Sequence, residues 1–207
     1  MPRPPIPVRA ATHADSPLVQ RVLARAFADD PVMRHLFPDD ATRPERLRRF
    51  FALVARAESD PADTLIAEPD ETAATGDGAA VTVWRKPGAW RTPVAAMLRL
   101  ALPMLATFGT GLPRALRVQD LLEKHHPREP HWYLEFAGCD PARQGRGLGG
   151  AAIRARLAET DAAGIATALE TANPVNLPIY TALGFRETGT FDVPGGPTFW
   201  TMWRDPI

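Results

Sequence analysis

The chain has 207 residues, and its 24 basic and 24 acidic side chains give a formal net charge of zero. An apolar content of 45% is typical of a globular protein with a core, and we expect one domain over residues 1–207. A nucleic-acid partner would favour an excess of basic residues, so none is expected.

Cysteine content and apolar segments indicate the compartment. Cys139 is the only cysteine and cannot form an internal disulfide, which favours a reducing compartment. Residues 1–7 lack the apolar core of a signal peptide, and the apolar stretch 94–112 is interrupted by Arg99 and Pro103. We therefore expect a cytoplasmic protein without a membrane partner, either a monomer or a homodimer.

The first part of the chain predicts three strands and four helices. Apolar spacing, Ser16-Pro17 and Thr92-Pro93 at helix starts, and a glycine turn at residues 76–78 set the boundaries. Pro103 should kink the third helix, which glycines end. We expect strands at 8–12, 64–68 and 79–85, and helices at 16–29, 44–58, 92–108 and 116–126.

The second part of the chain alternates strands and helices around a glycine-rich loop. Gly164 is expected to end the longer helix, and a Pro-Gly turn at 193–197 joins the last two strands. We expect strands at 132–139, 167–170, 186–192 and 198–204, and helices at 148–163 and 176–183.

The glycine-rich loop lies between the expected strand 132–139 and the expected helix 148–163. Its sequence is Gln144-Gly145-Arg146-Gly147-Leu148-Gly149-Gly150. N–H groups at a helix start have no partner within the helix, and the helix dipole is positive there. Glycines let this backbone approach an anion closely. The loop predicts a pyrophosphate site; the alternative is a tight turn without a ligand.

Dinucleotide-binding proteins offer another interpretation of this loop. Gly145, Gly147 and Gly150 satisfy G-x-G-x-x-G, and Glu170 follows 20 residues later. However, residues 140–144 separate the strand from the first glycine, and too little chain follows for further parallel strands. A nicotinamide-dependent oxidoreductase is therefore disfavoured, and the absence of G-K-S or G-K-T excludes a P-loop.

The spacing Gln144-x-x-Gly147-x-Gly149 resembles the acetyl-CoA loop of the GCN5-related N-acetyltransferases. The strand 132–139 with Asp140-Pro141, and the run 176–185, extend the resemblance. Within this superfamily the chain is most similar to puromycin N-acetyltransferase-like members. The similar stretches are Ala26–Asp29, Ala79–Trp84, Glu129–Pro130, Leu169–Thr171, Asn176–Pro178, Val193–Pro197 and Trp200–Met202.

The resemblance implies an α/β (α+β) fold with a mixed, strongly twisted sheet of about six to seven strands flanked by helices. The strands ending near Cys139 and Glu170 would splay apart, and acetyl-CoA would enter between them as cosubstrate. Pantetheine would pair with a strand edge, and the loop amides would hold the pyrophosphate, with Arg143 or Arg146 reaching a phosphate. The implied acetyl-CoA residues are Ala137, Gly138, Cys139, Gln144, Gly145, Arg146, Gly147, Leu148, Gly149, Gly150, Asn176 and Tyr180.

Acetyl transfer needs a proton donor for the leaving thiolate, and Tyr180 matches the general-acid position of the superfamily; the alternative is a packed core tyrosine. Amides near Gly138 and Cys139 would stabilise the oxyanion. Asn176 either caps its helix or also contacts the cosubstrate.

The general base is Glu135, Glu170 or a water relay. Simple alternation places Glu135 on the face of Tyr133, Ala137 and Cys139. Puromycin N-acetyltransferase-like members carry a small apolar residue at this position, so Glu135 is a departure that leaves the substrate open. Either glutamate can instead pair with an arginine.

Acceptor-binding residues are expected on three segments. Asp29 and Asp30 border the acceptor site by the resemblance, while Trp84, Trp90 and residues 94–112 would wall an apolar pocket. The alternative for the aspartates is surface capping.

Other reactive side chains receive simpler interpretations. Cys139 is interpreted as a buried small hydrophobe and not as an acyl carrier, and His125 and His126 as cations at a helix end. No metal is expected, because the histidines lack ligand spacing.

These features favour an acetyl-CoA-dependent N-acetyltransferase that acts on a small-molecule amine, antibiotic-like or aminonucleoside, by direct attack in a ternary complex. The alternative is a non-catalytic acyl-CoA-binding sensor of the same fold.

Overall fold

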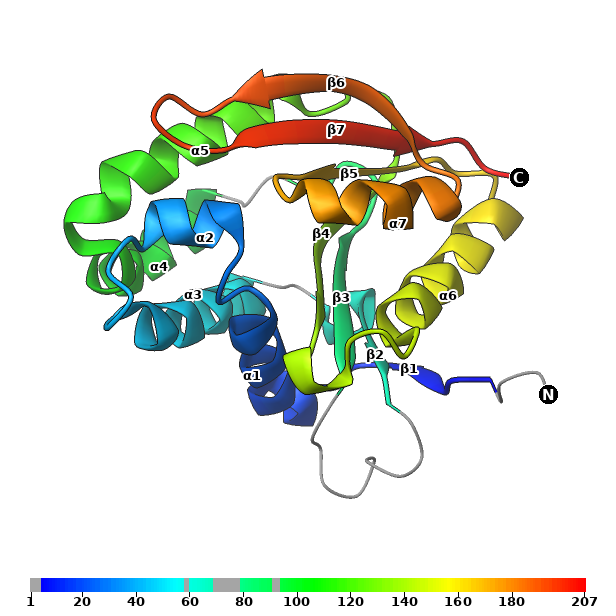
Figure 1. Cartoon of the computed structure of the whole chain (residues 1–207), viewed down its shortest axis with the longest axis horizontal. Coiled ribbons are helices and arrows are strands. Elements are labelled where there is room, and N and C mark those ends of the chain that lie inside the picture. Colours follow the sequence, from blue (N-terminus) through cyan, green and yellow to red (C-terminus); the bar gives the residue numbers. More distant parts are fainter. Residues whose placement is uncertain (1–4, 58–59, 69–78, 91–93) are drawn as a thin grey trace.

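The computed structural model describes residues 5–57, 60–68, 79–90 and 94–207. Its centre is a seven-stranded sheet in the order β1-β2-β3-β4-β5-β7-β6 (Figure 1). Neighbouring strands are antiparallel except for the parallel pair β4 and β5. The strands are β1 Val8–Ala10, β2 Thr64–Ala67, β3 Ala80–Arg85, β4 Trp132–Cys139, β5 Thr167–Thr171, β6 Arg186–Asp192 and β7 Thr198–Arg204. The expected mixed fold and its strand positions are confirmed. The expected turn at residues 76–78 lies outside the described residues.

The helices among these residues are α1 Ser16–Ala26, α2 Pro31–Leu36, α3 Arg43–Ala57, α4 Val94–Phe108, α5 Leu112–His125, α6 Leu148–Ala162 and α7 Leu177–Ala182. Figure 1 shows α1 to α5 gathered on one side of the central strands, with α6 on the other side. Helix α5 begins four residues earlier than expected, because Pro113 fits its first turn. The Thr92-Pro93 signal lies outside the described residues. No helix in the described part of the chain is long and apolar enough to cross a membrane.

Helix α2 was not predicted from the sequence. Its six residues are too few to show a helical apolar period. The local signal is present, since the Asp30 carboxylate accepts hydrogen bonds from the N–H groups of Val32 and Met33, and Pro31 follows it directly. This cap starts α2 directly after α1 and places Asp30 beside the sheet.

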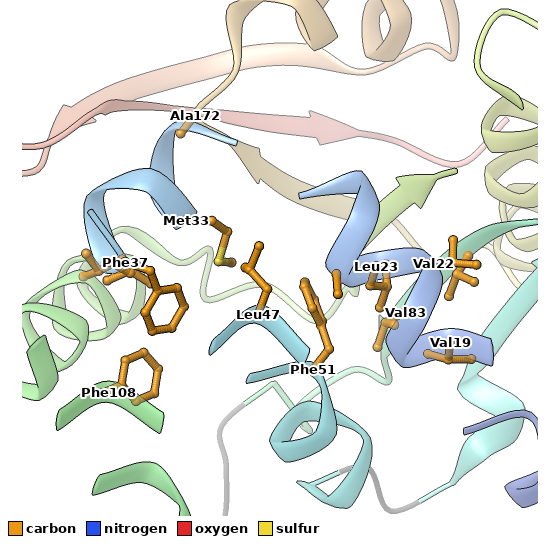
Figure 2. Packing of buried hydrophobic residues seen from close by; sticks show 14 of the residues in the cluster. Val19, Val22, Leu23, Met33, Phe37, Leu47, Phe51, Val83, Phe108 and Ala172 are labelled. Carbon is orange, nitrogen blue, oxygen red and sulfur yellow. The ribbon is translucent and has the colours of Figure 1, made fainter. Parts of the chain in front are cut away.

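Three apolar clusters hold the sheet between its helices. Figure 2 shows the largest one, in which Leu23 of α1 and Phe51 of α3 lie near Val83 of β3. The two smaller clusters lie on the α6 side, and Trp84 in one of them is fully buried. The sheet is thus covered on both faces around β3 and β4.

The parallel pair β4 and β5 is hydrogen-bonded over only part of its length. Residues 132–134 pair with residues 167–169, and beyond them the strands diverge (Figure 1). The expected splay is therefore confirmed. It leaves the β5-facing edge of residues 135–139 without a strand partner in the described sheet.

A β-bulge in β4 lies where the splay begins. Val83 of β3 pairs with Phe136, but the next residue of β3, Trp84, pairs with Leu134, so Glu135 is the extra residue. As a result Phe136 packs with the α1 and α3 side, while Ala137 joins the α6 side. The expected common face of Glu135 with Ala137 and Cys139 is therefore wrong, because the bulge reverses the alternation.

Candidate active site

A cavity of about 230 Å³ lies at the divergence of β4 and β5. Helices α2, α3, α4, α5 and α7 contribute to its wall together with the two strands and Phe199 of β7. Much of the wall is apolar: Phe27, Val54, Leu122 and Phe136 are among its residues. Such a cavity, lined mainly by apolar side chains and also by polar groups, is the usual form of a small-molecule site.

The polar groups of this cavity include most of the expected catalytic residues. The polar lining side chains are Asp30, Gln119, Glu123, His126, Tyr133, Glu135, Glu170, Thr171, Asn176 and Tyr180, with the ring of Trp90 beside them. The fold thus brings Tyr180, Glu135 and Glu170, which are distant in sequence, to one cavity. The expected contribution of Trp90 to the pocket wall is confirmed.

Tyr180 lies on α7 and is buried. Burial raises the pKa of its hydroxyl to about 12, and the negative charge of Asp30 adds to this effect. A group with this pKa stays protonated at neutral pH. Tyr180 is therefore chemically suited to donate a proton to a thiolate, whose conjugate thiol has a pKa of about 8.5.

The two candidate bases differ in their partners. Glu135 forms an ion pair with Arg85, with 2.6 Å between Oε2 and Nε, and its side chain is 25% exposed. The side chain of Glu170 is only 2% exposed, and its Oε2 atom has no hydrogen-bond partner among the described residues. Glu135 is thus held by an arginine near solvent, whereas Glu170 is buried beside His126 and the Tyr133 hydroxyl, which hydrogen-bonds to its carboxylate.

The expected acceptor residues do not all reach the cavity. Asp30 lines it, and burial raises the pKa of its carboxyl group against the opposing effect of the two N–H groups it caps. Asp29 is exposed and pairs with Arg34 at 3.2 Å. Trp84 is fully buried under α6, where its Nε1–H donates to Thr82. The placement of Trp84 at the pocket is thus wrong, because the strand turns this ring to the other face.

The glycine-rich loop forms the N-terminus of α6. Gly147 is the N-cap residue in a left-handed conformation, with a φ of 82°, and no side chain caps the first turn. Residues 144–147 are exposed, while Leu148 is buried and anchors the turn. The first N–H groups of α6 are therefore available to an anion.

The glycines of this loop leave space at its surface. A Cβ atom at Gly149 would have no neighbour within 4 Å, so packing within the protein does not require glycine there. At Gly150 a Cβ would approach the guanidinium of Arg154 at 3.2 Å. Exposed Arg154, one turn into α6, and Arg146 flank the helix start and add positive charge. This arrangement fits a diphosphate.

The free edge of β4 connects the cavity to this loop. Its last residues, Ala137 to Cys139, precede the loop directly. Gly138 is required by packing, since a Cβ there would lie 2.9 Å from side-chain atoms of Leu23 and Ala26. The unpaired edge and the uncapped helix start together fit the extended amides and the diphosphate of acetyl-CoA.

Asn176 does not have the capping role considered for it. It precedes α7, but its side chain makes no capping hydrogen bond. Asn173 instead caps the preceding turn by accepting from the N–H of Val175 at 3.2 Å. Asn176 lines the cavity and is available to a ligand there.

The histidines at the end of α5 have different environments. His125 is exposed and its Nδ1 lies 2.8 Å from the carbonyl oxygen of Leu121, in keeping with a helix-end position. His126 is the C-cap residue of α5, and unlike His125 it is buried and lines the cavity. In the described part of the chain, no three His, Cys, Asp or Glu side chains are grouped to hold a metal ion.

Sequence reasoning missed several residues of this region. Glu123 and His126 reach the cavity from the last turns of α5, and Arg154 follows the glycine loop by one helical turn. Their only signals in the sequence were a polar helix end and a basic residue four positions after Gly150.

This sheet with its split parallel pair has the fold of the GCN5-related N-acetyltransferases. No protein-family model matches the chain. It is similar over 98% of its length to the histone acetyltransferase HPA2 and related acetyltransferase of Corynebacterium glutamicum, with a TM-score of 0.74, 25% identity and 97% of that chain covered. The chain is an acetyltransferase of the GCN5-related type by its fold and by this likeness.

Two further solved structures share the fold at lower identity. The polyamine N-acetyltransferase of Drosophila melanogaster has a TM-score of 0.59 and 15% identity, with 97% of this chain and 99% of that chain covered. The arylalkylamine N-acetyltransferase 2 of Aedes aegypti has a TM-score of 0.60 and 15% identity, with 98% and 99% covered.

Proposed function

We propose that this protein transfers the acetyl group of acetyl-CoA to the amine of a small molecule, by direct attack in a ternary complex. The observation that carries the proposal is the cavity at the β4–β5 split, which holds Tyr180 and Glu170 beside an unpaired strand edge. We further propose a single-domain cytoplasmic enzyme, monomeric or homodimeric, that needs no metal.

The cavity wall supports a cationic amine with an apolar body as acceptor. Asp30, Glu123 and Glu170 are acidic residues of the cavity lining. Phe27, Phe50 and other apolar side chains form the rest. Carboxylates attract an ammonium group, and aromatic faces bind the carbon skeleton. A puromycin-like aminonucleoside meets this description, as do arylalkylamines.

The chain's own residues supply the remaining requirements. Glu170 takes the proton of the bound ammonium and leaves a nucleophilic amine, while Tyr180 gives a proton to the departing thiolate. Backbone N–H groups near Gly138 and Cys139 stabilise the oxyanion. Bound acetyl-CoA supplies the activated acetyl group.

An acceptor panel tests the proposal. Release of free thiol from acetyl-CoA is measured with puromycin, tryptamine, agmatine and an alanine-terminated peptide, and mass spectrometry identifies the product. We expect the apolar amines to react with the highest kcat/KM. Hydrolysis alone, or reaction with the peptide only, would contradict a small-molecule acceptor.

A non-catalytic acyl-CoA sensor is the second candidate, because the same loop and strand edge would serve binding alone. Calorimetry with acetyl-CoA separates the two. A sensor binds the thioester but shows no turnover with any amine of the panel.

A further inference from the structure

A chain of buried polar groups runs from the cavity to the start of β4. Glu170 Oε1 lies 3.6 Å from His126 Nδ1, and His126 Nε2 lies 3.1 Å from His131 Nε2. His131 Nδ1 lies 2.6 Å from the carbonyl oxygen of Glu129. The side chains of Glu170 and His126 are 2% and 3% exposed, so water does not replace these contacts.

The Glu129 carbonyl oxygen, at the end of this series of polar groups, determines which ring nitrogens carry hydrogens. The Glu129 carbonyl can only accept, so Nδ1 of His131 carries a hydrogen and donates it. In neutral His131 the Nε2 atom is then bare and accepts from Nε2–H of His126. Burial lowers the pKa of His131, against the opposing effect of the Glu129 carbonyl, which keeps this ring a neutral acceptor.

This assignment leaves two acceptors facing each other. In neutral His126 the Nδ1 atom is bare, and it faces an oxygen of the Glu170 carboxylate. Two lone pairs in a buried site repel unless a proton lies between them. The face of the Trp90 ring stacks on His126 with 3.9 Å between centroids and an angle of 27°. Such a face favours the cationic ring.

We infer that Glu170 and His126 form a carboxylate–imidazolium ion pair, with His131 holding His126 in this state. The inference rests on the proposed function for its catalytic part: the free Oε2 of Glu170 accepts the proton of the acceptor ammonium. The N–H bond breaks, its electron pair stays on nitrogen, and an O–H bond forms at Oε2. That proton passes to solvent before the next turnover. His126 and His131 are positioning residues, because they keep a buried carboxylate ionised.

The other charged groups around the pair are accounted for. Arg85 of β3 neutralises Glu135 of β4, so this glutamate does not compete for the proton. Glu123 of α5 and Asp30 of α2 line the same cavity and add negative charge that favours the imidazolium. Tyr133 of β4 packs its ring edge against His126, and its hydroxyl hydrogen-bonds to Glu170. It stays neutral, since burial and the charges of Glu170 and Glu135 raise its pKa well above the ordinary value.

Nuclear magnetic resonance tests the charge of His126 without turnover. Long-range ¹H–¹⁵N spectra of the labelled protein at neutral pH are expected to show His126 protonated on both nitrogens and His131 as the Nδ1–H tautomer. In Glu170→Gln the amide N–H₂ can donate to His126, so this ring is expected to become the neutral Nε2–H tautomer. A neutral His126 in the wild-type protein would overturn the inference.

Kinetics test the positioning role. We expect His126→Gln to lower kcat/KM on the order of 10²-fold and to move the acid limb of its pH profile to higher pH, because the carboxylate loses its cationic partner. His125→Gln, at the exposed neighbouring position, is the matched control and is expected to leave kcat/KM and its acid limb unchanged. Acetyl-CoA affinity and thermal unfolding show that each variant is folded.

His131 variants separate positioning from packing. His131→Gln retains an acceptor for His126, so its kcat/KM is expected to stay near the wild-type value. In His131→Leu we expect kcat/KM to fall roughly tenfold, with the same shift of the acid limb of its pH profile. Equal losses of kcat/KM in the two variants, without a shift of the acid limb, would contradict the positioning role of His131. If the expected spectra are obtained but no amine is acetylated, the proposed function fails while the ion pair of Glu170 and His126 stands.

Discussion

The two halves of the candidate site are built in different ways. The half around residues 144–150 is a continuous segment, exposed, and formed by backbone N–H groups. The half around Glu170 and Tyr180 is buried and assembled from strands and helices that are far apart in the sequence. A backbone site depends on local conformation, whereas a cavity of ionisable side chains depends on its surroundings. The first half should therefore govern cosubstrate affinity, and the second should govern rate.

Tyr180→Phe gives the sharpest separation of the two halves. The ring keeps its packing against Phe185, but the proton donor is lost. We expect kcat to fall on the order of 10²-fold while the dissociation constant for acetyl-CoA stays within about twofold. Stopped-flow assays of thiol release and calorimetry measure the two quantities.

The opposite result would place Tyr180 in cosubstrate binding and not in proton transfer. If Tyr180→Phe weakened acetyl-CoA binding and left kcat unchanged, its hydroxyl would be a binding group. Ala182, the last residue of the same helix, is exposed, and Ala182→Ser serves as the control.

Gly149→Ala tests the loop half. A Cβ there meets nothing in the protein, and alanine is the better helix former by about 0.5–1 kcal/mol, so the free protein should become more stable. We expect acetyl-CoA affinity to fall by roughly tenfold, because the methyl group keeps the diphosphate from the N–H groups. Thermal unfolding and calorimetry measure the two effects.

The other end of α6 provides the matched control. Gly164 ends the helix with a φ of 66°, and its Cβ would also meet nothing. Gly164→Ala should lower the free energy of unfolding by about 1 kcal/mol through backbone strain alone, without an effect on acetyl-CoA. Unchanged affinity in Gly149→Ala would remove the loop from the binding site.

This division also explains what could be predicted from the sequence. The strand 132–139 and the closing strands were placed at their observed bounds, because their patterns are local. The prediction that Ala137 shares a face with Glu135 was wrong, because the bulge at Glu135 depends on pairing with β3. The burial of His126 was not predicted, because it depends on the rings of Trp90, His131 and Tyr133 that pack around it.

Cys139 lies between the two halves, at the end of β4, and should affect neither strongly. Burial raises the pKa of its thiol to about 11, and the charge of Asp140 adds to this effect. A raised pKa favours the neutral thiol, so below pH 9 little nucleophilic thiolate is present in the folded protein. We expect native Cys139 to react with iodoacetamide at pH 8 roughly a hundredfold more slowly than after unfolding. Cys139→Ser should change kcat by less than about threefold, since no step needs the sulfur. Rapid native labelling together with loss of turnover would instead indicate a covalent acyl-cysteine, and both halves would then have to be assigned again around the thiol.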